Sequence, residues 1–166
     1  DKNNPLFFYR DPNKTSDSIK KLSESDAKNW NNFSLHIEKL TDFLERIYQI
    51  TPPQLPKAGI KDAISIKSIL SPILKHGSQG VVDLLRATPM MMPEMMDEWF
   101  ENEILRGALS TSGIYHSSLG PFAASTGYNF LHQHLYSDGV ILDNNFIDGG
   151  TLEFAKTLQN IAESYN

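Results

Sequence analysis

The feature that most constrains the fold of this chain is a long stripe of apolar residues that recur at every third or fourth position between residues 25 and 50. Such spacing places them all on one face of an α-helix. Ser23 or Ser25 can cap the start of the helix, and Asp26 stands favourably in its first turn. The proline-rich run 51–56 ends the helix, because proline lacks the N–H that a helix needs. The pattern predicts a helix over Ser25–Ile50 whose buried face comprises Ala27, Trp30, Phe33, Ile37, Leu40, Phe43, Ile47 and Ile50.

Helical spacing also marks most of the chain after residue 60. The predicted helices are Ala63–Leu70 with a continuation past Pro72 to Lys75, Ser78–Ala87, Met92–Phe100, Asn102–Ser110, the apolar-rich Phe122–Tyr136 and Thr151–Tyr165. The stripe predicted to be buried in the last helix is Leu152, Ala155, Leu158, Ile161, Ala162 and Tyr165. Leu6–Tyr9 is a β-prone run, and a single strand of this length needs a partner strand. We therefore predict one domain over residues 1–166 that is mainly α, α+β at most, with one or a few short strands.

Composition excludes several classes of protein. The 166 residues contain no cysteine, which excludes disulfide scaffolds, thiolate nucleophiles and sulfur-bound metal centres. A net charge of −5 and the lack of a Lys/Arg-rich run argue against nucleic acid as a partner. No apolar run approaches the roughly 18 residues of a membrane span. Because Asp1–Pro5 contain neither an initiator methionine nor a signal core, we expect a piece of a longer protein, cytoplasmic or peripheral to a membrane.

Histidines and carboxylates are the first candidates for chemistry. The histidines are His36, His76, His116, His132 and His134. His132 and His134 are two positions apart and would point to opposite sides of a helix, so we expect no metal site and no catalytic residue here. An acidic cluster surrounds Trp99 and Phe100: Glu94, Asp97, Glu98, Glu101 and Glu103. It could hold a glycosidase-like pair, but a solvated helix face is the better interpretation.

Methionines and glycines suggest a different kind of site. All five methionines lie together: Met90, Met91, Met92, Met95 and Met96. Flexible thioethers suit a surface that adapts to a long lipophilic ligand, and an ordinary core contact is the alternative. Gly113, Gly120 and Gly127 flank the same region and allow close approach of backbone or ligand. Gly149-Gly150 before a helix could cradle a phosphate, but a Gly-x-Gly-x-x-Gly fingerprint is absent, so we expect no FAD or NAD to bind to this chain alone.

Several segments together resemble a known family. They are Met96–Leu109, Ser117–Tyr128, Phe130–His134, Gly149–Leu152, Phe8–Pro12, Ile19 and Ser25–Ala27. This series is similar to the phytoene desaturase-like FAD-dependent oxidoreductases, in particular the branch of pyridine-nucleotide-disulfide oxidoreductase domain-containing proteins. In that family an N-terminal and a C-terminal segment hold FAD, and the region between them builds the substrate domain.

The resemblance implies that this chain is the helical substrate-side domain, without the nucleotide-binding domain and inactive alone. FAD in the full-length parent would carry out the oxidoreductase chemistry on a lipophilic substrate. The implied partners are the remaining FAD-binding part of the same polypeptide, that substrate and, compatibly, a membrane surface. The predicted substrate-binding residues are Met91, Met92, Met95, Tyr128, Leu131 and His132, and Gly149 and Gly150 are the predicted cofactor-binding residues. The alternative is a non-catalytic helical interaction module that binds a partner through a methionine-rich apolar patch.

Overall fold

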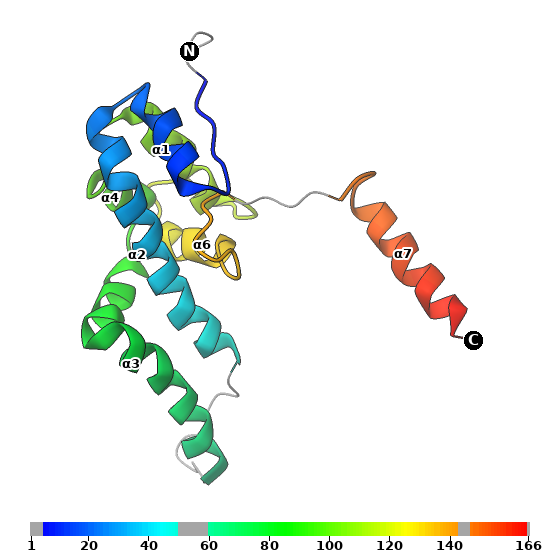
Figure 1. Ribbon diagram of the computed structural model, residues 1–166. Coiled ribbons are helices and arrows are strands. Elements are labelled where there is room, and N and C mark those ends of the chain that lie inside the picture. The colour runs from blue at the N-terminus through cyan, green and yellow to red at the C-terminus, as the bar shows by residue number, and fades with distance from the viewer. Residues whose placement is uncertain (1–4, 50–59, 143–146, 166) are drawn as a thin grey trace.

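The fold is a bundle of α-helices around one long central helix (Figure 1). The computed structural model describes residues 5–49, 60–142 and 147–165, with the backbone alone over 60–72. The elements are α1 Pro12–Lys20, α2 Glu24–Gln49, α3 Ile60–Ala87, α4 Met92–Asp97, α5 Glu103–Ser110, the 3₁₀ turn η1 Ser112–Ile114, α6 Thr126–Gln133 and α7 Thr151–Ser164. The predicted mainly α class is confirmed, and no strand occurs in the ranges just given.

The β-prone run Leu6–Tyr9 is not a strand, which corrects the prediction made for it. The segment lies against α1, where the Phe7 N–H donates to Ser18 Oγ at 2.8 Å and the Tyr9 N–H donates to Thr15 Oγ1 at 2.8 Å. Hydroxyl groups of α1 therefore accept these two backbone N–H groups, which in a sheet would donate to a neighbouring strand.

Helix α2 is the predicted spine, and it packs against α1, α3 and α6. It starts directly after Ser23, whose Oγ accepts the Asp26 N–H at 3.1 Å. The buried face includes Ala27, Trp30, Phe33, Ile37, Leu40 and Phe43, as predicted. The prediction was wrong for Ile47, because its side chain is 39% exposed in the last turns of α2. Ile50 and the proline-rich run 51–56 lie outside the described residues.

Phe33 occupies the centre of an aromatic cluster that joins α2 to the second half of the chain. Its ring centroid lies 4.9 Å from that of Phe100, 5.6 Å from Trp99, 5.8 Å from Trp30 and 6.2 Å from Phe130. The contacts with Phe100 and Trp99 are edge-to-face, the geometry that the ring quadrupoles favour. Removing this one ring would open a cavity that four other aromatic rings border.

Asp26 makes a second long-range connection from α2. Its carboxylate is fully buried and accepts the Glu101 N–H at 2.8 Å and the Asn102 N–H at 2.9 Å. Asn102 in turn caps α5, since its Oδ1 accepts the N–H groups of Ile104 and Leu105, both at 3.1 Å. A single carboxylate therefore positions the start of α5 on the start of α2.

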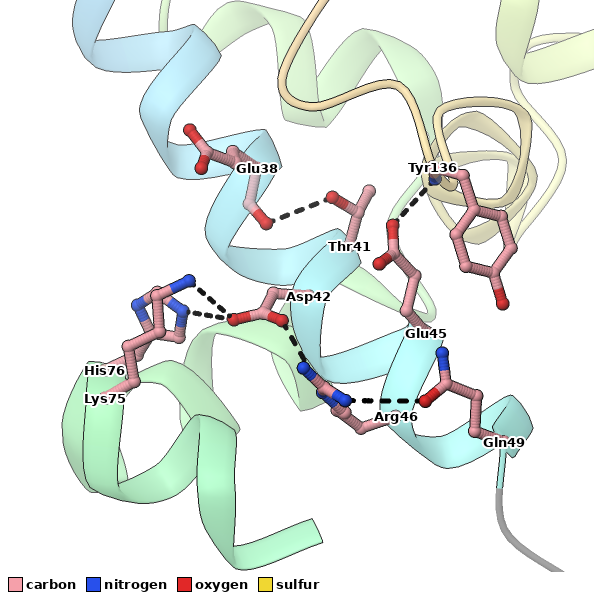
Figure 2. A network of polar contacts seen from close by, with 9 residues as sticks. All are labelled: Glu38, Thr41, Asp42, Glu45, Arg46, Gln49, Lys75, His76 and Tyr136. Atoms are coloured by element: carbon pink, nitrogen blue, oxygen red, sulfur yellow. Dashed lines mark hydrogen bonds and ion pairs between the residues drawn. The ribbon is translucent and has the colours of Figure 1, made fainter. Parts of the chain in front are cut away.

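Helix α3 consists of two helical segments that meet at Gly77, where φ is 75° and ψ is 173°. This left-handed φ favours glycine and separates the two predicted helices at the expected place. A polar network holds the kink on α2 (Figure 2): His76 Nε2 lies 2.8 Å and Lys75 Nζ 3.1 Å from Asp42 Oδ2. Burial alone would raise the pKa of Asp42, but hydrogen bonds from His76 and Lys75 outweigh burial and lower it.

Three of the five methionines belong to the core. Met92, Met95 and Met96 are buried, whereas Met90 and Met91 are half-buried. A Cβ at Gly127 would lie 2.9 Å from the Ala87 carbonyl oxygen and 2.8 Å from Met95 Cε, so only glycine allows α6 to approach this closely. The expectation that some methionines border a groove or an exposed apolar patch holds for Met90 and Met95, which line a small pocket beside α2, although no methionine is exposed.

Helix α7 forms as predicted, but its apolar stripe is not buried. None of its residues is buried, and the predicted core positions Leu152, Ala155, Leu158, Ile161, Ala162 and Tyr165 are all exposed. Figure 1 shows α7 standing away from the bundle. The helical period depends on the local sequence alone, whereas burial also needs a packing partner, which α7 lacks among the described residues.

Candidate functional site

A groove of about 480 Å³ lies between α4, α5 and the loop that precedes α6. Its lining is Pro93, Asp97, Glu103, Arg106, Gly107, Ser110, Thr111, Ile114, Pro121 and Phe122. A volume of this size is in the range of pockets that bind small organic molecules. Six of the ten lining residues lie in 97–107 and 121–122, within two of the segments that resemble the flavoprotein family.

Helical periodicity explains why these side chains face the groove. Met92, Met95 and Met96 form the buried face of α4. Pro93 and Asp97, which are four positions apart, therefore lie together on its other face, toward α5. On α5 the buried residues are Leu105 and Leu109. The opposite side, spaced by three and four, carries Glu103, Arg106, Gly107 and Ser110.

The groove combines apolar walls with a charged rim. Pro93, Ile114, Pro121 and Phe122 supply the apolar surface, and the Phe122 side chain is 74% exposed. Across the two helices the Arg106 guanidinium donates to the Asp97 carboxylate. Glu103 adds a second carboxylate to the lining, so the groove offers apolar surface and disfavours an anionic ligand.

Gly107 leaves the floor of the groove open. A Cβ added there would meet no atom within 4 Å. A larger side chain at residue 107 would therefore extend into the groove without displacing protein atoms. The position offers a way to block the groove while α5 stays intact.

The predicted substrate-binding residues lie outside this groove. Met92, Met95 and Leu131 are buried, and Met91 is half-buried at the start of α4, so none of the four lines the groove. Their role as ligand contacts remains a prediction. None of the ten lining residues was predicted as a substrate contact, including the apolar ones Pro93, Ile114 and Phe122. The spacing of Pro93 and Asp97 was the available signal, and Phe122 was hidden inside a helix predicted four residues too early.

Tyr128 and His132 meet a residue that the sequence did not suggest. The Tyr48 hydroxyl at the end of α2 contacts the Tyr128 hydroxyl and lies 3.3 Å from His132 Nδ1. Burial, and then the hydrogen bond with Tyr128, raise the pKa of Tyr48 to about 12. The Tyr48 phenol is therefore neutral at physiological pH, and the three side chains form a polar contact between α2 and α6 outside the groove.

A smaller pocket of about 110 Å³ contains two methionines, Met90 and Met95, together with His36 and Trp99. The His36 and Trp99 ring centroids are 5.1 Å apart, and burial lowers the pKa of His36. Glu98, at the edge of this pocket, forms an ion pair with Arg86. Two carboxylates of the predicted acidic cluster, Asp97 and Glu98, thus each have an arginine partner.

The histidines at 132 and 134 point in different directions. His132 is exposed, whereas His134 is buried with Nδ1 at 2.7 Å from the Phe130 carbonyl oxygen and Nε2 accepting the Leu142 N–H at 3.0 Å. In the part of the chain that the structure describes, no group of three or more His, Cys, Asp or Glu side chains could hold a metal ion.

The His134 contacts predict a pH dependence of stability. Burial lowers the pKa of His134, although the hydrogen bond to Phe130 acts in the opposite direction. Nδ1–H donates and Nε2 accepts only when the ring is neutral, and the unfolded chain takes up a proton first, at a pH of about 6.5. We expect this contribution to be present above pH 6.5 and to be lost as the pH falls through the folded pKa.

Urea unfolding at a series of pH values measures this effect. Below pH 6.5 the free energy of unfolding should change less steeply with pH in His134→Gln than in the unchanged chain. His36→Gln reports the contribution of His36, the other histidine whose pKa is lowered by burial. An unchanged slope in His134→Gln would show that His134 does not cause the dependence.

Gly149 and Gly150 precede α7 with φ values of 81° each. Both are exposed, and the Gly150 N–H donates to the Ile147 carbonyl at 2.9 Å. A cofactor contact at this pair stays a prediction.

Fold and groove together define a mainly helical domain with a partly apolar surface groove. The chain is 22% identical over 152 residues to pyridine nucleotide-disulfide oxidoreductase domain-containing protein 2 of Rattus norvegicus. The match covers 87% of this chain and 26% of the rat protein, so the chain spans about a quarter of that relative's length. This similarity fits a domain related to redox enzymes. No family model and no solved structure matches the chain.

Proposed function

We propose that this chain is the substrate-side helical domain of an FAD-dependent, phytoene desaturase-like oxidoreductase, and that its groove binds part of a lipophilic substrate. The observation that carries the proposal is the origin of part of the groove lining: six of its ten residues, from Asp97 to Gly107 and at Pro121 and Phe122, lie within the regions that resemble such flavoproteins. The similarity to the rat protein, which extends over most of this chain, supports the proposed assignment to an oxidoreductase.

FAD belongs, in this proposal, to the remaining part of the same polypeptide. The described residues contain no strand, and therefore no strand–glycine-loop–helix unit of the kind that holds a dinucleotide pyrophosphate. The flavin would supply the hydride chemistry. Gly149 and Gly150 are proposed as an edge that faces it.

The groove residues act by shape and by removing water. Phe122, Pro121, Pro93 and Ile114 offer hydrocarbon surface to the substrate, and burying apolar area contributes about 25 cal/mol per Å². The Asp97–Arg106 pair leaves neither of its two charges uncompensated toward the substrate. No residue here needs to transfer a proton.

The exposed face of α7 is proposed to pack on the FAD-binding part or to lie on a membrane surface. Phe154, Leu158 and Ile161 are each about half exposed. No helix among the described residues is long and apolar enough to cross a membrane. The alternative, an interaction module with a methionine patch, is supported less well, because three of the five methionines are buried and the other two are half-buried.

Blocking the groove at Gly107 tests the proposal. We expect Gly107→Leu to weaken binding of diphenylhexatriene, a neutral polyene whose fluorescence increases in apolar sites, by about tenfold, equivalent to about 1.4 kcal/mol. Leucine is a better helix former than glycine, so the melting temperature should stay equal or rise. Fluorescence titration and thermal unfolding measure the two quantities.

Gly107→Ala is the matched control, because a methyl group fills little of the groove; its affinity should stay near that of the unchanged chain. Equal probe affinity in Gly107→Leu would show that the groove is not the lipophilic site. The redox part is tested separately by the flavin absorbance of the full-length parent and its bleaching by an apolar substrate. A parent without flavin would refute the assignment to a flavoprotein.

A further inference from the structure

A second pocket, of about 310 Å³, lies between the N-terminal segment, α2 and the loop 138–141. Its apolar walls include Tyr9, Pro12, Leu35, Val140 and Ile141. It shares no lining residue with the groove between α4 and α5. The proposed substrate site therefore does not account for it.

Two carboxylates stand where this pocket meets a small polar one. Glu38 and Asp138 line both the 310 Å³ pocket and a pocket of about 110 Å³ whose other lining residues are all polar. A Cβ at Gly139 would lie 3.2 Å from Glu38 Oε2, so the Glu38 carboxylate lies against the backbone that carries Asp138. The fold thus brings together two acidic side chains from distant parts of the sequence.

Helical periodicity explains why α2 is apolar in one pocket and acidic in the other. Leu35, Glu38, Asp42 and Glu45 follow one another at intervals of three or four positions, so they share one face of the helix. Leu35 lines the larger pocket, whereas Asp42 and Glu45 line the smaller one. The helix face changes from apolar to acidic at Glu38.

The two shared carboxylates have no cation beside them in the part of the chain that the structure describes. Asp42, by comparison, is held by Lys75 and His76 (Figure 2). Glu38 takes part in the contacts of Figure 2 only through its backbone carbonyl. Between described residues, no ion pair or hydrogen bond involves the side-chain carboxylate of Glu38 or of Asp138. Two negative charges therefore remain uncompensated there at the edge of an apolar pocket.

These features fit a ligand with an apolar body and one positive charge at its end. Among the described lining residues of the larger pocket, Glu38 and Asp138 outnumber the one guanidinium, that of Arg10, which disfavours an anion. Both carboxylates are exposed, so a cation beside them keeps part of its hydration and its desolvation cost is small. The apolar walls would cover the rest of the molecule.

We propose that this pocket binds a small amphipathic cation of the alkylammonium or arylalkylammonium class. Its apolar body lies against Leu35 and Val140, and its ammonium group lies at the carboxylates of Glu38 and Asp138. The proposal does not depend on the flavoprotein assignment, because it concerns a different pocket and can be tested on this chain alone.

Phenylpropylamine, phenylpropanol and phenylpropionate form a matched series of probes, since they share an apolar body and differ in the charge at its end. We expect affinity to fall in that order, with the amine bound roughly fivefold more tightly than the alcohol, the upper value for an exposed ion pair. Added salt should reduce this preference. In ¹H–¹⁵N titrations the amide signals of Gly139 and Val140 should move with the amine, and the titration curves give the affinities.

Glu38→Gln and Asp138→Asn keep the side-chain shapes and remove the charges. Each should reduce the preference for the amine over the alcohol, and the double substitution should abolish it. Glu24→Gln removes an exposed carboxylate of the same helix outside both pockets and should leave the preference unchanged. Thermal unfolding of the double variant should match that of the unchanged chain, because neither carboxylate is buried or paired with a described residue.

Equal affinities of the amine and the alcohol for the unchanged chain would overturn the proposal. So would a preference that persists in the double variant. The groove between α4 and α5 also contains two carboxylates, Asp97 and Glu103, so it is the competing location. Signals that move around this groove, while those of Gly139 and Val140 stay in place, would equally overturn the proposal.

Discussion

Replacing Phe33 with alanine should lower the free energy of unfolding by about 3–5 kcal/mol, the usual cost of removing a buried phenylalanine. The loss should lie in the upper half of this range, because the ring is fully buried and borders Trp30, Trp99, Phe100 and Phe130. These neighbours come from α2, from the 98–102 connection and from α6, so they cannot all move inward to fill the cavity. Urea unfolding followed by far-UV circular dichroism measures the change.

Leu35→Ala on the same helix is the control, since Leu35 is 62% exposed and its truncation should change stability by about 0.5 kcal/mol or less. If Phe33→Ala and Leu35→Ala had equal effects, Phe33 would not be the centre of the core. A loss of helical signal in Phe33→Ala under native conditions would agree with the expectation, because a small domain has little stability to lose.

Replacing Asp26 with alanine should cost about 2–4 kcal/mol. The substitution leaves the N–H groups of Glu101 and Asn102 buried without an acceptor, and it releases the start of α5 from α2. Asp26→Asn should have a smaller effect, because an amide keeps one oxygen acceptor but places its NH₂ group against the second N–H. Chemical unfolding of both variants gives the order.

Glu24→Ala serves as the control for charge alone. Glu24 stands in the same first turn, is exposed, and forms only a 3.8 Å pair with Lys28, so its loss should cost less than about 0.5 kcal/mol. A result in which Asp26→Asn is as stable as the unchanged chain would mean that the two backbone hydrogen bonds contribute little.

The groove illustrates what a sequence can and cannot indicate about a site. Pro93 and Asp97, like Glu103 and Gly107, have the i, i+4 spacing of one helix face, so each half of the lining was accessible from the sequence. That the two faces oppose each other depends on the angle between α4 and α5, which the buried contacts of Met92, Leu105 and Leu109 determine. Phe122 was placed in a helix that in fact begins at Thr126, because apolar content alone does not distinguish a helix from the loop before it.

The methionines also show what the sequence indicates and what only the tertiary structure decides. Their clustering was visible, and both an adaptable surface and a core contact agreed with it. The close approach of Gly113 and Gly127 decided for the core at Met92 and Met95, since the missing Cβ atoms make room for these two side chains.

By itself the sequence determined most of the helices, because helical period, capping residues and helix-breaking residues act over a few neighbouring positions. It therefore indicated α2, a break between Lys75 and Ser78, and the helix α7. Only the tertiary structure decided which apolar faces are buried. It buries Trp30 and Phe33, leaves Ile47 and the stripe of α7 exposed, and joins Asp26 to Asn102 across 76 positions. Burial and such contacts depend on a partner distant in sequence, and no local pattern specifies where that partner lies.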